Sequence, residues 1–191
     1  MKLEREFYLR DGLTVARELI GKKIVTNLRD GLTGGIIVET EAYMGELDAA
    51  AHSHKGLTER TKIFFGSGGF VYVYLIYGRN ICTNVVANVE NVPEGVLIRA
   101  LQPTDGIELM KLRRGKKNLR DLCSGPGKLS QALGVTKNFY GADLCGDEIL
   151  IEPTDFQFQV AATKRINVDY AGDAADYPWR FIAVGNKFLS K

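Results

Sequence analysis

The sequence predicts one α+β domain: a mainly antiparallel, curved β-sheet flanked by helices, with a protruding β-hairpin. Strand patterns dominate the chain, helical patterns are few and short, and the two kinds follow one another in mixed order. With 191 residues the chain can bury one sizeable core but is short for two domains. We therefore expect a single domain over residues 1–191.

Composition and charge narrow the class of protein. The chain is 45% hydrophobic and 25% charged, as ordinary globular proteins are, and its formal net charge is only +2. The three cysteines are an odd number without CxxC spacing, and the two histidines, His52 and His54, are too few for a His-rich metal centre. We expect neither a disulfide framework nor a zinc site.

The apolar residues do not form long runs. None of the runs approaches the ~18 residues of a membrane span, and the N-terminus is charged without the apolar core of a signal peptide. These observations predict a cytoplasmic protein with no membrane partner.

The N-terminal part of the chain predicts a helix and two strands. Asp11 can cap a helix over residues 12–20, whose apolar residues fall on one face. Residues 24–27 and 35–43 have the composition of strands, and a Gly-containing turn at 29–31 separates them.

The middle of the chain predicts a loop followed by a hairpin. Residues 48–69 are polar and Gly-rich, which is typical of a loop. Residues 70–77 are rich in β-branched and aromatic side chains and give the strongest strand signal. Residues 78–80 then form a turn, and 81–86 return as the second strand.

The next segment predicts a short strand and a helix. Residues 95–101 form the strand, which Pro103 ends. Thr104 or Asp105 can cap a helix that reaches about Arg114.

The remaining residues predict one more helix and several strands. Residues 124–133 have a proline near the start of the helix and a glycine, Gly134, past its end. Residues 149–184 hold short strands separated by polar turns.

Two carboxylates and an aromatic ring share one face of the strand at 35–43. Side chains alternate along a strand, so Glu39, Glu41 and Tyr43 point the same way. A positioned carboxylate can act as a general base that takes a proton from water. The alternative is that both glutamates lie on a solvated strand face, and the pattern alone leaves the two interpretations open.

Aromatic side chains gather around this window. Tyr43, Tyr72, Tyr74 and Tyr77 are four of the eight tyrosines, and His52 is close in sequence. Flat rings can sandwich a planar ligand and attract a cationic one. The alternative is that the tyrosine-rich strand packs a core. Tyr77, at the predicted hairpin tip, is a candidate wedge for prying apart stacked surfaces.

Basic residues cluster between residues 111 and 120, where six lysines and arginines occur without an acid. Such a stripe suits contact with a phosphate backbone, but a charge run is also typical of a solvated helix face. Residues 124–128 offer backbone N–H groups to a phosphate at a helix start, or serve as a structural cap. They lack the Walker spacing and are not a P-loop.

Six segments in series resemble the alkyladenine (3-methyladenine, or methylpurine) DNA glycosylases. Each segment alone is a modest match, whereas six in this order with compatible spacing are specific. The resemblance spans about residues 19–133. The segments read VETEAY at 38–43, AAHS at 50–53, VYVYLIYG at 71–78, CTN at 82–84, VLIRALQP at 96–103 and LCSGPGKL at 122–129.

The resemblance implies a monofunctional enzyme of base-excision repair that needs no metal or cofactor, with one DNA glycosylase domain over residues 1–191. Members of this family flip a damaged purine out of duplex DNA and hydrolyse its N-glycosidic bond, which leaves an abasic site. The implied partner is double-stranded DNA containing 3-methyladenine, 7-methylguanine, hypoxanthine or ethenoadenine. We expect a monomer, associated with the nucleoid in a bacterium.

The resemblance also implies which residues form the site. Glu41 matches the general base that activates the attacking water, and Arg99 matches the arginine that helps to hold that water. Glu39 is then a supporting or structural carboxylate.

Further matching positions concern the flipped base. Tyr43, His52 and Tyr74 match the rings that stack on this base. Asn84 matches an asparagine that excludes normal guanine by clashing with its exocyclic amine.

Another set of positions concerns the duplex. Tyr77 matches the ring that fills the gap left by the flipped nucleotide. Arg79 follows it where many relatives have an apolar residue, and adds a candidate phosphate contact. Arg60 and Lys128 are further candidate ligands of the DNA backbone.

Two other functions compete with this one. A module that binds distorted duplex without catalysis would need neither Glu41 nor Arg99, so these residues argue against it. A hydrolase of small nucleosides would not show binding that depends steeply on salt and duplex length.

Overall fold

The sheet is organised around one long central strand, β2 (Gly31–Tyr43). The computed structural model describes residues 2–76, 78 and 80–190. β2 pairs along one edge with β5 (Glu94–Asp105). Its other edge is shared, first by β1 (Lys23–Leu28) and then by β8 (Arg180–Ala183). The second half of β2 therefore lies between two strands that are far apart in the sequence.

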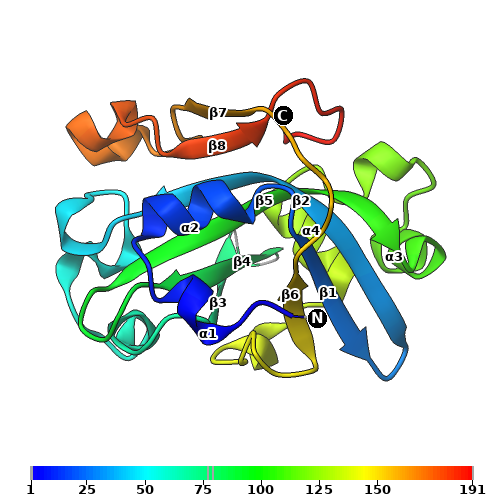
Figure 1. Cartoon of the computed structure of the whole chain (residues 1–191), viewed down its shortest axis with the longest axis horizontal. Helices are drawn as coiled ribbons and strands as arrows, with labels where there is room; N and C mark the ends of the chain where they lie inside the picture. Colours follow the sequence, from blue (N-terminus) through cyan, green and yellow to red (C-terminus); the bar gives the residue numbers. More distant parts are fainter. Residues whose placement is uncertain (1, 77, 79, 191) are drawn as a thin grey trace.

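The other strands extend this sheet outward. Its order is β3-β4-β5-β2-β1-β6, with β8 joined to β2 and β7 to β8, and every pair is antiparallel (Figure 1). The sheet curls, and the α+β class is confirmed. The outer strands are β3 (Val71–Ile76), β4 (Asn80–Ala87), β6 (Ile149–Glu152) and β7 (Val160–Thr163).

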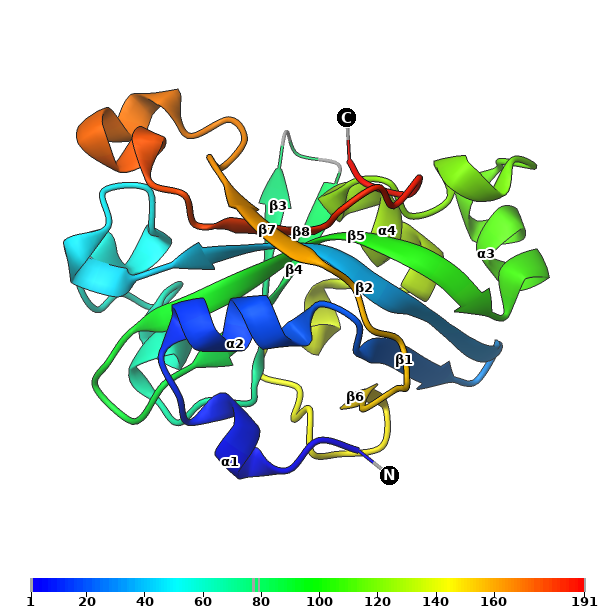
Figure 2. The ribbon, with the colours of Figure 1, turned by 45° about the horizontal axis from the view of Figure 1, so that its top comes forward.

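Short helices cover the sheet. They are α1 (Arg5–Tyr8), α2 (Gly12–Leu19), α3 (Ile107–Arg114) and α4 (Pro126–Leu133). Figure 2 shows α2 in front of the sheet and α4 behind it. The hydroxyl of Thr40 in β2 donates to the carbonyl of Ala16 in α2 over 2.8 Å. None of the described helices is long and apolar enough to cross a membrane.

The structure confirms two of the predicted helices and the residues that begin or end them. The carboxylate of Asp11 caps α2 by accepting from the N–H of Thr14 over 3.0 Å. Helix α4 starts at Pro126 and ends at Gly134, whose φ of +74° is the left-handed conformation that favours glycine. Because these signals act within one helix turn, local sequence is enough to predict them.

The hairpin is also confirmed. Strands β3 and β4 pair from Val71 with Val85 to Ile76 with Asn80. Strand β4 pairs with β5 only from Asn84 onward. The last residues of β3 and the first residues of β4 therefore extend beyond β5, toward the top of Figure 2.

Two predictions around Pro103 are wrong. Strand β5 does not stop there but continues to Asp105, because a register shift beside Gly35 places Pro103 at a β-bulge, where a missing N–H is tolerated. Thr104 and Asp105 therefore belong to the strand and do not cap α3. The chain turns into α3 at Gly106, which has a left-handed φ of +63° and no side-chain cap.

Gly106→Ala tests this turn. A Cβ at Gly106 would lie 2.1 Å from the carbonyl oxygen of Leu32. We expect a loss in unfolding free energy of about 2–5 kcal/mol, from left-handed strain of about 1–2 kcal/mol and overpacking of about 1–3 kcal/mol. Gly115→Ala at the other end of α3 is the control, since its φ is +59° and its Cβ would meet nothing within 4 Å. Equal losses in urea unfolding would contradict the steric argument.

Candidate active site

The two glutamates of β2 lie inside the protein. Glu39 and Glu41 are both 0% exposed, because Arg99, Arg180 and the C-terminal residues Ile166 and Ser190 pack around them. The solvated-face interpretation is therefore wrong. Both side chains turn to the same side of the sheet, where Arg99 of β5 lies between them.

Glu39 accepts four hydrogen bonds. Its Oε1 accepts from Arg99 Nε at 3.2 Å, Arg180 Nη1 at 2.9 Å and Ser190 Oγ at 2.8 Å, and its Oε2 accepts from the backbone N–H of Ser190 at 2.6 Å. A carboxylate has about four acceptor positions. The four donors are shared unequally, three on Oε1 and one on Oε2, and they fasten β8 and the C-terminal segment to β2.

Glu41 has one donor fewer. Its Oε1 accepts from the backbone N–H of Ile166 at 2.7 Å. Its Oε2 accepts from the Tyr43 hydroxyl at 2.9 Å and from Arg99 Nη1 at 3.2 Å. Three of about four acceptor positions are therefore used by the described residues. All three donor residues, Ile166, Tyr43 and Arg99, also line the neighbouring cleft, so Glu41 lies directly behind its wall.

Arg99 holds the two carboxylates together. Its side chain is almost fully buried, and burial alone would lower its pKa, but the charges of Glu41 and then Glu39 raise the pKa above its ordinary value. A buried ion pair of this kind requires good geometry, because both charges lose their water.

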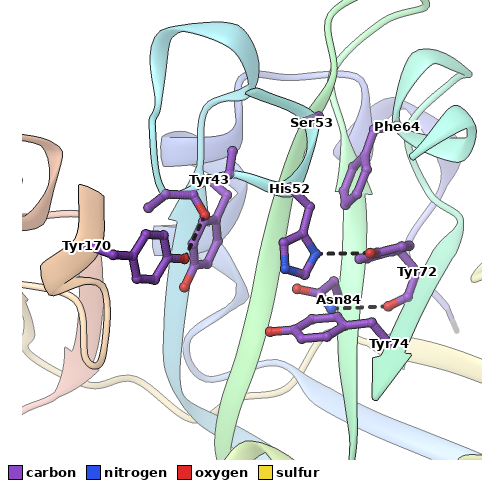
Figure 3. A pocket seen from close by; sticks show the side chains of 11 residues that line it. Tyr43, His52, Ser53, Phe64, Tyr72, Tyr74, Asn84 and Tyr170 are labelled. Atoms are coloured by element: carbon purple, nitrogen blue, oxygen red, sulfur yellow. Dashed lines mark hydrogen bonds between the residues drawn. The ribbon is translucent and has the colours of Figure 1, made fainter. Parts of the chain in front are cut away.

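A cleft of about 460 Å³ opens in front of Arg99, and a smaller cavity of about 40 Å³ lies beside it. Four rings line both spaces: Tyr43, His52, Tyr74 and Tyr170. Figure 3 shows Tyr43 on one side of the cavity and His52 with Tyr74 on the other. The structure therefore brings together the three rings that the sequence predicts.

The ring positions on the far wall are fixed by contacts among them. His52 and Tyr74 meet edge to face with centroids 4.4 Å apart. The Nδ1 of His52 lies 2.9 Å from the hydroxyl of Tyr72, a hydrogen bond drawn in Figure 3. Tyr72 itself is 1% exposed and packs with Phe64. The core interpretation therefore holds for Tyr72 but not for Tyr74.

His52 is exposed toward the cleft on one side, while the rest of its ring is enclosed. Burial and then the nearby guanidinium of Arg60 lower the pKa of His52 from 6.5 to about 4. The imidazole is therefore neutral at pH 7.

Asn84 reaches the inner cavity from β4. Its Nδ2 donates to the backbone carbonyl of Tyr72 over 3.2 Å. Figure 3 shows that this bond leaves the amide oxygen on the side of the cavity.

The predicted DNA contacts are spread around this site. The exposed Lys128 lies across the cleft on α4, with its ammonium 3.2 Å from the carbonyl of Ser124. Arg60 lies beside the rings, where its Nε donates to the Tyr72 hydroxyl over 3.0 Å. Tyr77 and Arg79 lie outside the described residues.

The basic residues at 111–120 differ in their surroundings. Lys111 pairs with Glu108 and Arg113 with Asp30, whereas Arg114 lines the cleft. The solvated-helix interpretation thus holds for part of the run only.

Cysteine chemistry has no support in this site. Cys82 lines the cleft, but burial raises the pKa of its thiol to about 11, so the thiol is protonated at neutral pH. Among residues 2–76, 78 and 80–190, no group of three or more His, Cys, Asp or Glu side chains is placed to hold a metal ion.

Sequence reasoning missed the contribution of the C-terminal third. Ile166, Tyr170, Arg180 and Ser190 all touch the glutamates or line the cavities. They carry no local pattern, and they reach the site only because β8 pairs with β2.

Known proteins are similar to this chain over nearly its whole length. The model of the family described as "Methylpurine-DNA glycosylase" matches residues 6–187. A protein of Alkaliphilus oremlandii (strain OhILAs) named "Putative 3-methyladenine DNA glycosylase" is 48% identical over 201 residues, which cover 100% of both chains. Relatives with the same name in Bacillus cereus (strain G9842) and Clostridium novyi (strain NT) are 48% and 46% identical, over 100% of this chain and 100% and 98% of theirs. The chain belongs to the methylpurine-DNA glycosylase family.

Proposed function

We propose that this protein is a base-excision repair glycosylase that removes alkylated and deaminated purines from double-stranded DNA by hydrolysing the N-glycosidic bond. The observation that carries this proposal is the hydrogen bonding of Glu41. This buried carboxylate lies directly behind the wall of the ring-lined cleft, and the described residues use three of its about four acceptor positions. Because Glu41 is 0% exposed, the wall must move before a water reaches the remaining position. The family and the names of the relatives support the class of substrate.

In this mechanism Glu41 is the general base. It accepts a proton from a water that attacks the sugar carbon as the purine leaves, and Arg99 helps to hold that water. Positive charge develops on the sugar during departure, so a fixed carboxylate also stabilises the transition state. The N–H of Ile166 and the Tyr43 hydroxyl keep the carboxylate oriented. Glu39, which four donors hold, supports Arg99 and does not touch the water.

The rings would bind the flipped base. Purines methylated at N3 or N7 are cationic, and Tyr43 and Tyr74 attract a cation by about 0.5–2 kcal/mol for each good contact. Because His52 is neutral at pH 7, it stacks on such a base without repelling it. Asn84 lines the inner cavity, and by resemblance to the family its side chain would exclude normal guanine through a steric clash with the exocyclic amine.

The inner cavity must widen to admit a base. Its volume of about 40 Å³ has room for only a few waters. Flipping a nucleotide costs a few kcal/mol, and less when damage has weakened the pair. We propose that Tyr77 fills the gap in the duplex, that Arg60, Arg79 and Lys128 contact phosphates, and that the protein acts as a monomer.

Glu41→Gln tests the general base. Glutamine keeps the shape but cannot accept the proton, so we expect the single-turnover rate of 3-methyladenine release to fall by about 10²–10⁴-fold. Binding to a lesion-containing duplex should persist. Glu39→Gln is the matched control, in which we expect a lower melting temperature and a rate within about tenfold of wild type. A fully active Glu41→Gln variant would show that another group is the base.

A pH titration tests the lowered pKa of His52. We expect the NMR signals of its imidazole to titrate below the ordinary 6.5, with a midpoint no lower than about 4 because solvent in the cleft screens the partly exposed ring. Because the pKa is lower in the folded state, the neutral imidazole favours folding. Its contribution to the unfolding free energy is fully present above pH 6.5 and is lost as pH falls toward 4. In His52→Gln this pH dependence of the unfolding free energy should be absent. A midpoint at or above 6.5 would contradict the enclosed environment.

Lys128→Ala tests the DNA-facing side of the cleft. A lost phosphate contact should weaken binding of damaged and undamaged duplexes by a similar factor and reduce the slope of log affinity against log salt by about 1. Lys23→Ala is the control, because Lys23 pairs with Asp105 and Glu152 and lines neither the cleft nor the inner cavity. An unchanged salt slope in Lys128→Ala would exclude this contact.

A further inference from the structure

A buried ion pair lies behind the wall of the base pocket. Arg165 and Asp48 both have side chains that are 0% exposed, and they bond through two parallel contacts of 2.5 and 2.8 Å. Neither residue lines the cleft or the inner cavity, although Tyr43 lines both. The guanidinium carbon of Arg165 is 4.8 Å from the centre of the Tyr43 ring, so this ring separates it from the pocket.

Further contacts also hold the guanidinium of Arg165 in place. Its carbon is 5.1 Å from the ring centre of Trp179, and its nitrogens donate to the carbonyls of Ala42 and Ala174 over 3.0 and 2.9 Å. Arg165 therefore has one orientation, with its plane fixed by a carboxylate and two carbonyls. A planar, fixed guanidinium is suited to stacking on a ring, which lysine is not.

Three parts of the site meet at this ion pair. The backbone N–H of Ile166, the next residue after Arg165, donates to Glu41. Asp48 accepts from the N–H groups of Met44 and Ala50, which orders the turn that leads to His52. The pair thus connects the carboxylate and both walls of the pocket.

Stability alone does not account for this pair. A buried ion pair adds little over apolar packing, because both charges are desolvated. In addition, the Nε of Arg165 is buried without a hydrogen-bond partner among the described residues. A group that adds little to stability and lies against a pocket wall is better explained by orientation.

We propose that Arg165 is a positioning residue, which sets the plane of the Tyr43 ring and aims the Ile166 N–H at Glu41. This inference rests on the proposed function for its chemistry. Arg165 acts through these two groups and does not touch the base. Its loss should therefore slow the chemical step more than it weakens DNA binding.

Arg165→Lys is the main test, because it keeps the charge but loses the planar fork. We expect the single-turnover rate to fall at least tenfold, while affinity for an undamaged duplex changes less than threefold. The emission of Trp179, the only tryptophan in the chain, should also change. Arg5→Lys is the matched control, since Arg5 binds both oxygens of Asp143 at 2.7 Å and lies 4.5 Å from the ring centre of Phe70, away from the cleft.

A double-mutant cycle gives a second readout. If Arg165 acts through the Tyr43 ring, Arg165→Lys should cost at least threefold less in a Tyr43→Leu background than in wild type. If Arg165→Lys does not fold, Trp179→Leu replaces it, because that change frees one face of the guanidinium and should slow the reaction at least threefold.

Three results would overturn the inference: a folded Arg165→Lys variant within twofold of the wild-type rate, equal losses in both backgrounds of the cycle, or an equal loss in Arg5→Lys. For a chain in which Arg165→Lys does not fold, a Trp179→Leu rate within twofold of wild type would do the same. A wild-type protein that releases no base would instead overturn the proposed function. The change in Trp179 emission does not need catalysis, so it would still test the contact of Arg165.

Discussion

The structure depends on the placement of one guanidinium, that of Arg99, between two buried carboxylates. Two negative charges on the same face of a strand repel each other, and neither could be kept from water without a cation and further donors. Arg99 supplies the cation from β5, and the C-terminal third supplies Arg180, Ser190 and Ile166. Removing one partner of such a group typically costs about 3–5 kcal/mol.

This constraint explains why β2 changes its neighbour midway. Along the first half of β2 one edge pairs with β1, and the side chains there are apolar or small. At Glu39–Glu41 the neighbour becomes β8, which brings Arg180 to Glu39. The branch in the sheet is therefore the means by which residues far apart in the sequence reach the two acids. The same branch makes the two glutamates differ in hydrogen bonding, since Glu39 accepts from four donors and Glu41 from three.

The sequence predicts what is set by local geometry. Alternation along a strand places Glu39, Glu41 and Tyr43 on one face, and Asp11 and Gly134 mark helix ends. The prediction that the strand ends at Pro103 was wrong, because a β-bulge accommodates the proline. This bulge depends on the partner strand and is not visible in the local sequence. The difference between Glu39 and Glu41 could not be derived either, because it rests on Ser190, which is 151 positions from Glu39. Only the family resemblance distinguishes Glu41 from Glu39 as the expected base, whereas Arg165 and Tyr170 carry no local signal.

The small inner cavity has a consequence for how such a protein searches DNA. While it is empty, its rings lie too close to accept a purine, so every candidate base must use part of its binding free energy to separate them. A normal base also gives up full stacking and pairing in the duplex. The two costs add, and they form an energetic threshold at the entrance. In the proposed mechanism, most bases would be rejected there, before Asn84 contacts their edges.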